Sequence, residues 1–275
     1  MVRLSNGMAA AGLAVLSACA SLADSGPAGT DARTLVFEAE RAFAVTAQTE
    51  GVRQGFLSVL ADDSIVFGQA GIVSGIDRYT NAPESQFSLM WWPSEGGGAS
   101  SGDLYFSTGP FVVAADGEDR GFGQYLSVWQ RQDDGAIRLL ADHGISLPAD
   151  LVGPQHAAFS KAYAEALAGV TGPAAACTST LEDADTALNA GTGQAGMPVL
   201  LRGDRLSVLS AGSPVGLGIG QAYLQTRIVR EAVSRDYGMT AGQGPLPAAD
   251  RPPVTYLRIW GRSGCDWRLL IDLTD

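Results

Sequence analysis

The side chains best suited to chemistry lie in two neighbouring segments that we expect to form a hairpin. On its first strand Tyr125, Ser127, Trp129 and Arg131 share one face, because successive side chains of a strand point to opposite sides. Tyrosine and tryptophan combine apolar area with one polar group. This face therefore suits either a ligand pocket or a contact between domains.

The partner strand adds charged groups to the same hairpin. Arg138, Leu140 and Asp142 share a face by the same alternation, and Asp134-Gly135 supplies the tight turn. His143 titrates near neutral pH and directly follows Asp142. Because adjacent residues of a strand face opposite sides, Asp142 and His143 do not form a ready catalytic pair.

Other catalytic and cofactor motifs do not fit the chain. Gly216, Gly218 and Gly220 lack the spacing and the βαβ context of a dinucleotide loop, and there is no G-x-S-x-G nucleophile elbow. The only histidines, His143 and His156, lack metal-ligand spacing to other donors. We expect no cofactor and no metal site.

The first residues are typical of an export signal. Met8 to Leu16 is a short apolar stretch after Arg3, too short to span a bilayer. Leu16-Ser17-Ala18-Cys19 resembles the bacterial lipobox, which implies cleavage before a lipidated Cys19; an ordinary signal peptide cut after Ala18 or Ala20 is the alternative. Ala20, in place of Asp, resembles the sorting pattern for the outer membrane, so we expect a lipid-anchored protein facing the periplasm.

Charge and cysteine content set further bounds. The net charge of −11 disfavours nucleic acid as a partner, because an acidic chain repels phosphate. In an exported protein, the two cysteines that remain after Cys19, Cys177 and Cys265, suggest a disulfide. Two buried thiols that never meet are the alternative.

Helical spacing comes first in the chain and strands follow. Leu35, Ala39, Ala42 and Phe43 predict a helix that ends at Gly51. Shorter helices are expected from Val52 to near Asp62-Asp63 and over 75–82, and strands over 64–67, 87–92, 103–108, 111–114, 123–131 and 137–142. Helices followed by a meandering antiparallel sheet indicate an α+β fold.

The second half of the sequence repeats the first. Residues 125–131 (YLSVWQR) match 256–262 (YLRIWGR), and 138–142 (RLLAD) match 268–272 (RLLID). We therefore expect a duplicated domain, although two hairpins of similar composition could mimic the pattern. The predicted divisions are a signal peptide over 1–18, a lipidated tether over 19–30, a first domain over 31–147, a helical linker over 148–175 and a divergent second domain over 176–275.

The first domain resembles the SnoaL-like branch of the nuclear-transport-factor-2-like superfamily. The resemblance rests on residues 38–63, Trp92-Pro93, residues 101–104, residues 123–129 and Asp142. It implies a cone in which helices cover one face of a strongly curved sheet and leave a hollow. It also implies dimerisation through the sheet, which a tandem copy could form within one chain as a pseudo-dimer.

Ketosteroid isomerase belongs to the same superfamily, and an enzyme of that type needs a carboxylate base and donors for an oxyanion. The resemblance makes Asp103 and Asp142 candidate bases. A turn after Gly102 is the structural alternative for Asp103, and an ion pair is the alternative for Asp142. The further candidates are His143 for catalysis and Trp91, Trp92, Tyr105, Tyr125 and Trp129 for ligand binding; Trp91 and Trp92 could equally be core.

Three functions remain open. The first is a membrane-tethered binding or accessory module for a small apolar or aromatic ligand. The second is an isomerase, dehydratase or hydrolase with a pocket carboxylate. The third is a structural envelope lipoprotein that docks a protein partner.

Overall fold

A computed structural model describes residues 31–149, 167–174, 176–190, 195–202, 205–208, 226–244 and 253–274. The expected signal peptide, Cys19, the tether and the glycines at 216–220 lie outside these ranges, as does most of the expected helical linker over 148–175. We call residues 31–149 the first half and the described residues from 167 onward the second half.

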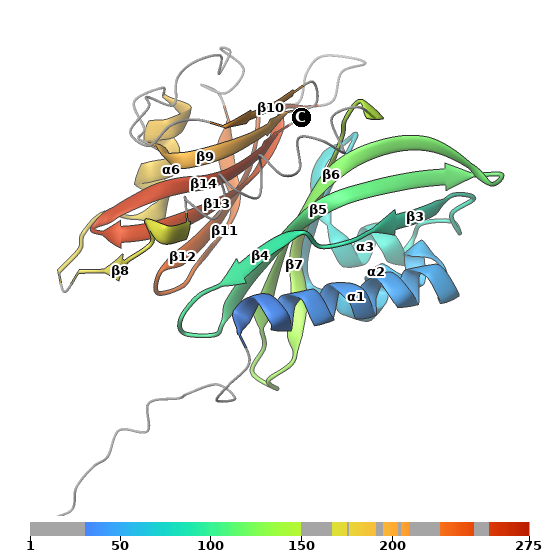
Figure 1. Cartoon of the computed structure of the whole chain (residues 1–275), viewed down its shortest axis with the longest axis horizontal. Helices are drawn as coiled ribbons and strands as arrows, with labels where there is room; N and C mark the ends of the chain where they lie inside the picture. The colour runs from blue at the N-terminus through green and yellow to red at the C-terminus, as the bar shows by residue number, and fades with distance from the viewer. Residues whose placement is uncertain are drawn as a thin grey trace, which may run out of the picture.

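The first half contains three helices, two at its start and one after the second strand (Figure 1). Helix α1 (Ala32–Glu50) ends at Gly51, whose φ of 96° favours glycine. Helix α2 (Val52–Val59) follows at once, and α3 (Gly75–Thr80) begins at Ser74, whose side chain accepts a hydrogen bond from the Asp77 amide. The three predicted helices are therefore present.

The first sheet follows the order β2-β1-β7-β6-β5-β3, with β4 paired to β5. Its strands are β1 (Leu60–Gly68), β2 (Gly71–Ser74), β3 (Ser88–Trp91), β4 (Glu95–Gly98), β5 (Leu104–Ala115), β6 (Glu118–Arg131) and β7 (Ile137–Ser146). The predicted α+β class and curved sheet are confirmed (Figure 1). The sheet is mixed rather than wholly antiparallel, because β1 pairs with β7 in parallel.

Strand β5 replaces two predicted strands. It runs through Gly109 and Pro110, where the sequence suggested a break. Proline has no N–H to donate, so it is tolerated in a strand only where no partner needs that group. Pro110 lies where the outer neighbour of β5 changes from β4 to β3, which removes the conflict.

The second half contains a sheet with the same strand order, β10-β9-β14-β13-β12-β11, with β8 paired to β13. Its elements are β8 (Gly172–Pro173), α6 (Leu181–Asn189), β9 (Ala195–Arg202), β10 (Arg205–Val208), β11 (Arg227–Val233), β12 (Tyr237–Gln243), β13 (Thr255–Gly264) and β14 (Asp266–Thr274). The pair β9–β14 is parallel, as β1–β7 is in the first sheet.

A bulge falls at the same place in both sheets. The register shifts at Leu140 in the first sheet and at the matching Leu270 in the second. This bulge corrects the alternation predicted for residues 138–142. Leu140 packs towards the second sheet, and Leu139 lies among the side chains under the helices.

The two sheets face each other, and helices cover their outer faces. Leu126 and Val128 of the first sheet share one apolar cluster with Leu257 and Ile259 of the second. Polar contacts add to it, including the hydrogen bond from the Ile72 amide to Gln243 Oε1 at 2.8 Å. The layers are thus α1–α3, first sheet, second sheet and α6 (Figure 1).

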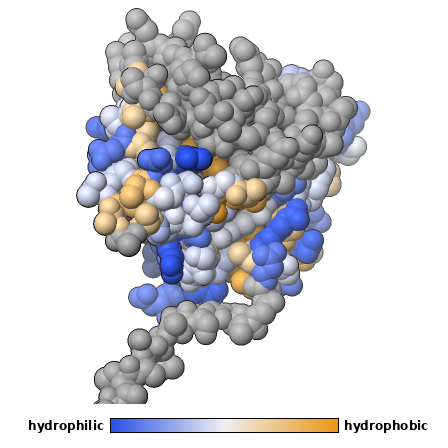
Figure 2. All heavy atoms as spheres, turned by 60° about the vertical axis from the view of Figure 1, so that its left-hand side comes forward, coloured by the Kyte–Doolittle hydropathy of each residue, from blue (hydrophilic) through white to orange (hydrophobic). Residues whose placement is uncertain are grey.

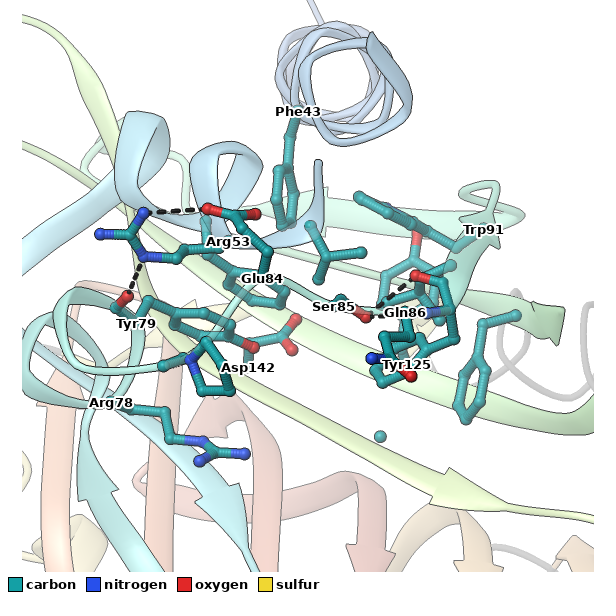
Figure 3. Close-up of a pocket in the computed structure, with 18 residues that line it drawn as sticks. Phe43, Arg53, Arg78, Tyr79, Glu84, Ser85, Gln86, Trp91, Tyr125 and Asp142 are labelled. Atoms are coloured by element: carbon teal, nitrogen blue, oxygen red, sulfur yellow. Dashed lines mark hydrogen bonds and ion pairs between the residues drawn. The ribbon is translucent and has the colours of Figure 1, made fainter. Parts of the chain in front are cut away.

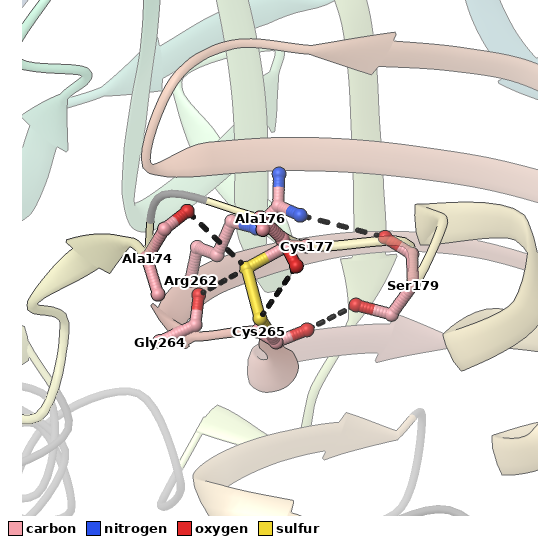
Figure 4. Close-up of a disulfide and its surroundings, with 7 residues drawn as sticks. All are labelled: Ala174, Ala176, Cys177, Ser179, Arg262, Gly264 and Cys265. Atoms are coloured by element: carbon pink, nitrogen blue, oxygen red, sulfur yellow. Dashed lines mark hydrogen bonds between the residues drawn. A yellow bond between two sulfur atoms is a disulfide. The ribbon is translucent and has the colours of Figure 1, made fainter.

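The predicted disulfide between Cys177 and Cys265 is present (Figure 4). It joins the segment before α6 to the turn between β13 and β14, so it fixes the helix of the second half to its sheet. Within the described residues, no helix is both long and apolar enough to cross a membrane.

Candidate functional site

A cavity of about 560 Å³ lies in the first half, between the helices, the loop over 82–87 and the inner face of the sheet (Figure 3). Aromatic side chains dominate its wall: Phe43, Phe56, Tyr79, Phe87, Trp91, Phe111 and Tyr125. A volume of several hundred Å³ with mostly apolar walls is typical of small-molecule sites.

Ring-to-ring contacts hold this aromatic wall in place. The Phe43 ring meets those of Phe56 and Trp91 edge to face, with centroids 4.8 and 4.6 Å apart. Tyr79 stacks on Phe56 with centroids 4.0 Å apart. Such contacts restrict rotamers, so the wall is formed before any ligand arrives.

Asp142 places a carboxyl group in the pocket wall. It lies on β7 opposite Ser127, whose hydroxyl donates to Asp142 Oδ2 at 2.8 Å. Burial raises the pKa of Asp142 to about 7; the Ser127 hydrogen bond opposes this shift and the charge of Glu40 adds to it. Asp142 is thus a carboxyl group that exchanges its proton near neutral pH.

A second carboxyl group, Glu40, lies fully buried behind the pocket. The indole of Trp91, which lines the pocket, donates to Glu40 Oε2 at 2.9 Å, and Trp129 donates to Oε1 at 3.0 Å. The Ser107 hydroxyl adds a bond of 2.6 Å. Burial raises the pKa of Glu40, while these three hydrogen bonds oppose the shift.

Sequence reasoning missed Glu40, although a signal was present. The buried stripe of α1 is Val36, Glu40, Phe43, Ala44 and Ala47, so Glu40 occupies an apolar helical position. The predicted stripe chose Ala42, which is exposed. An acid between Val36 and Phe43 at spacings of four and three was the available clue.

Tyr125 brings a hydroxyl group to the same place. It is 5% exposed and lines the pocket. Burial raises its pKa well above the ordinary value, the charges of Glu40 and Asp142 add to the rise, and the nearby Ser107 hydroxyl opposes it. No hydrogen bond of normal geometry satisfies the Tyr125 hydroxyl within the described residues, so it can bond to a ligand.

The loop over 82–87 lies at the mouth of the pocket and is held there by Arg53 of α2. Arg53 donates to the Tyr79 carbonyl at 2.9 Å and to Glu84 Oε1 at 3.0 Å, as the dashed lines of Figure 3 show. The charge of Arg53 is therefore matched by Glu84. Arg78 also lines the pocket and is exposed.

The structure places other predicted site residues away from the cavity. Asp103 accepts hydrogen bonds from Ser101 and from Ser234 of the second half, so it belongs to the contact between halves. Tyr105 is buried and donates to the Gly102 carbonyl at 2.8 Å. Neither residue is in the pocket wall.

Three of the remaining predicted site residues also lie outside the pocket wall. His143 is buried on the other face of β7, where its ring stacks on Phe67, and burial lowers its pKa to about 3. Trp92 is 49% exposed and lies outside the wall. Trp129 is core and reaches the site through its hydrogen bond to Glu40 and an edge-to-face contact with Phe43. Of the predicted set, Trp91, Tyr125 and Asp142 line the pocket.

The second half holds a buried ion-pair cluster at the corresponding position. Arg258 on β13 matches Ser127, and it binds Asp272 at 3.0 Å and Asp185 of α6 at 2.9 Å. All three side chains are fully buried. Burial alone would lower the pKa of Arg258, but Asp272 and Asp185 reverse this effect and raise it.

No group of three or more His, Cys, Asp or Glu side chains that could hold a metal ion occurs in the described part of the chain. The carboxyl groups of Asp142 and Glu40 are hydrogen-bonded to serine and tryptophan, and that of Glu84 to Arg53.

The first half has the nuclear-transport-factor-2-like fold. Helices against a curved sheet, with an open hollow between them, are the arrangement that the sequence resemblance implied. No protein-family model and no curated protein matches the sequence.

Solved structures with a similar fold cover about two fifths of the chain. An NTF2-like protein of unknown function from Pseudomonas putida is 16% identical and covers 43% of this chain and 92% of its own, with a TM-score of 0.34. A putative ketosteroid isomerase from Shewanella frigidimarina is 17% identical over 39% and 91%, with a TM-score of 0.31.

A Mycobacterium tuberculosis protein, solved in complex with estradiol-17beta-hemisuccinate, is 16% identical over 42% of this chain and 93% of its own, with a TM-score of 0.32. At these identities the likeness concerns the fold and does not extend to activity.

Proposed function

We propose that the first half binds a small apolar or aromatic molecule in its pocket. The observation that carries this proposal is the open cavity of about 560 Å³ with an aromatic wall and two carboxyl groups, Asp142 and the Arg53-paired Glu84. On the sheet side Asp142 is bonded by the uncharged Ser127, whereas the matching Asp272 of the second half is paired with Arg258.

Filling the pocket tests the proposal. Leu89 lines the cavity, whereas Val45 of α1 is 58% exposed and outside it. Leu89→Trp should weaken binding of a fluorescent apolar probe such as naphthylethanol by at least about tenfold, through lost volume. The matched variant Val45→Trp should leave the affinity unchanged. Equal affinities for both variants would refute a ligand in this pocket.

Asp142 favours an enzyme as the second candidate function. A carboxyl group with a pKa of about 7 in an apolar pocket suits general acid–base catalysis of the isomerase, dehydratase or hydrolase kind. Proton abstraction predicts that a cyclic ketone such as tetralone gains solvent deuterium next to its carbonyl when the protein is present. Asp142→Asn should abolish this exchange, and no exchange with the wild-type chain would count against an enzyme of this kind.

Attachment to a membrane is a separate part of the proposal. The lipobox-like Leu16 to Cys19 supports export and lipidation, with the outer membrane as the destination. Cys19→Ser should release the protein into the soluble periplasmic fraction and remove the acyl mass from the mature N-terminus. An N-terminus without acyl groups in the wild-type protein would contradict the proposed lipid anchor.

We also propose that the chain is a tandem duplication whose halves, divided near 148–175, pair as a pseudo-dimer. The equal strand orders, the bulges at Leu140 and Leu270 and the shared apolar cluster between the sheets support this proposal.

The surface of the second half gives less support to docking of a protein partner. Val229 and Val233 are exposed on the edge strand β11, but Arg227 and Glu231 share that face. Figure 2, which brings this side forward, shows hydrophilic residues among apolar ones on the described surface. A mixed face of this kind is ordinary protein surface.

A further inference from the structure

The carboxyl groups of Glu40 and Asp142 lack a positive partner among the described residues. Asp142 is hydrogen-bonded by the Ser127 hydroxyl, and Glu40 by two indoles and the Ser107 hydroxyl, all neutral donors. No positively charged side chain of the described residues is among the causes of the pKa shift of either group. Buried carboxylates normally require a paired cation, so this arrangement is incomplete in the free protein.

The second half shows what completes the same arrangement. There Asp185, from the N-terminal helix, and Asp272, from the last strand, share the guanidinium group of Arg258. The guanidinium carbon also lies 3.8 Å from the centre of the Tyr256 ring. A cation is therefore held by a helix acid, a strand acid and a tyrosine ring.

Each of these groups has a counterpart in the first half. Thr240, Arg258 and Asp272 are register partners across three strands, as are Ser107, Ser127 and Asp142. Ser107 binds the helix acid Glu40 just as Thr240 binds the helix acid Asp185. Tyr125 corresponds to Tyr256, since Tyr125 lies two residues before Ser127 and Tyr256 lies two residues before Arg258.

The main difference between the two clusters is the cation. At the position of Arg258 the first half has Ser127, which is itself buried, and its register partner Asp142 lines the cavity. The aromatic wall that includes Tyr125 and Phe43 adds ring faces that attract a cation. The buried hydroxyl of Tyr125 lies near the Ser107 hydroxyl but makes no hydrogen bond of normal geometry within the described residues, so its oxygen can accept an N–H from a ligand.

We propose that the ligand of the first half is an organic cation, an aromatic or apolar molecule with a protonated amine or guanidine that takes the place of the Arg258 guanidinium beside Asp142 and Tyr125. This inference rests on the proposed binding function and names the class of ligand. The acidic chain, with a net charge of −11, favours the approach of such a cation.

The charges around the pocket predict how binding depends on pH. The charged or titratable side chains around Asp142 are Glu40, Arg53, Arg78, Tyr79, Glu84 and Tyr125. Arg53 is paired with Glu84, and Arg78 is on the exposed rim. Because the pKa of Asp142 is about 7, the carboxyl group loses its proton, and binds a cation better, as the pH rises through that value.

Three naphthyl probes of similar size test the inference on the full mature chain. Naphthylethylamine is cationic, naphthylethanol is neutral and naphthylpropionic acid is anionic. At pH about 8 the amine should bind about tenfold more tightly than the alcohol, and the acid more weakly than both. The ratio of amine to alcohol affinity should fall towards one at pH about 5.5, as Asp142 becomes protonated.

Two variants sharpen the test. Asp142→Asn should reduce the ratio of amine to alcohol affinity towards one, and Ser127→Arg should abolish amine binding by supplying the cation internally. An alcohol that binds as tightly as the amine to the wild type would overturn the cationic ligand while leaving the proposed binding function intact. If none of the three probes binds, the proposed function itself fails.

Discussion

Ser127 and Arg258 occupy the same register position in the two sheets, each opposite an aspartate of the last strand. Ser127 donates one hydrogen bond to Asp142, whereas Arg258 forms an ion pair with Asp272 and a second one with Asp185. The first half has a cavity lined by Asp142, and the second half has a closed ionic cluster at the corresponding position.

Arg258→Met tests the cluster in the second half. The change keeps most of the side-chain volume but leaves Asp185 and Asp272 buried without a cation, so the free energy of unfolding should fall by about 3–5 kcal/mol. Denaturant unfolding followed by circular dichroism measures it. Arg120→Met, at an ion pair on the surface, should cost less than about 1 kcal/mol. Equal losses for the two variants would show that the buried cluster does not stabilise the fold.

Asp142→Asn should change how stability depends on pH. The pKa of Asp142 is raised from 3.8 to about 7 in the folded chain, so the folded state holds this proton more tightly than the unfolded state. The stabilisation of the folded state by this proton is complete below pH about 4 and is lost as the pH rises through about 7.

The free energy of unfolding should therefore decrease over this window by up to about 1.4 kcal/mol per pH unit from this one proton. Asp142→Asn should remove that part of the slope in urea unfolding measured at several pH values. Parallel wild-type and variant curves would contradict the assignment of a raised pKa to Asp142.

Asp103 and Asp142 should behave differently, although both were candidates from the sequence. Asp103 bonds to Ser101 and Ser234 outside the pocket, so Asp103→Ala should keep probe affinity within about twofold. The same change should lower the free energy of unfolding by about 1 kcal/mol, through lost hydrogen bonds. Loss of probe binding in a folded Asp103→Ala protein would show that Asp103 takes part in ligand binding.

Reduction of the disulfide should destabilise the chain. Cys177 and Cys265 are 88 residues apart, and closing a loop of this length contributes about 4 kcal/mol in the chain-entropy account. Guanidinium unfolding with and without a reducing agent should show this difference. The double variant Cys177→Ser/Cys265→Ser should be insensitive to the reducing agent, and an equal response in that variant would point to a different cause.

Much of the fold could be predicted because local patterns agree with it. Ser74 caps the start of α3, and Gly51 ends α1. Like the hairpin that contains Tyr125 and Asp142, these features depend on signals within a few residues of the sequence. The bulge at Leu140 could not be read from alternation, because an extra residue in a strand leaves no local mark in the sequence.

The site was harder to predict, since distant residues build it. Asp103 and Asp142 look alike in sequence, and only the packing of the two sheets separates an interface acid from a pocket acid. Glu40 becomes informative once Trp91 and Trp129 are seen to donate to it from two strands. The rim pair Arg53 and Glu84 depends on a loop whose path the sequence does not specify.

The stoichiometry of ligand binding tests the central claim most directly. Isothermal titration of the mature chain with naphthylethylamine at pH about 8 should give one site per chain, since Arg258 already fills the corresponding position of the second half. Leu89→Trp should abolish that site. Two equal sites per chain, or a single site that survives Leu89→Trp, would contradict the account.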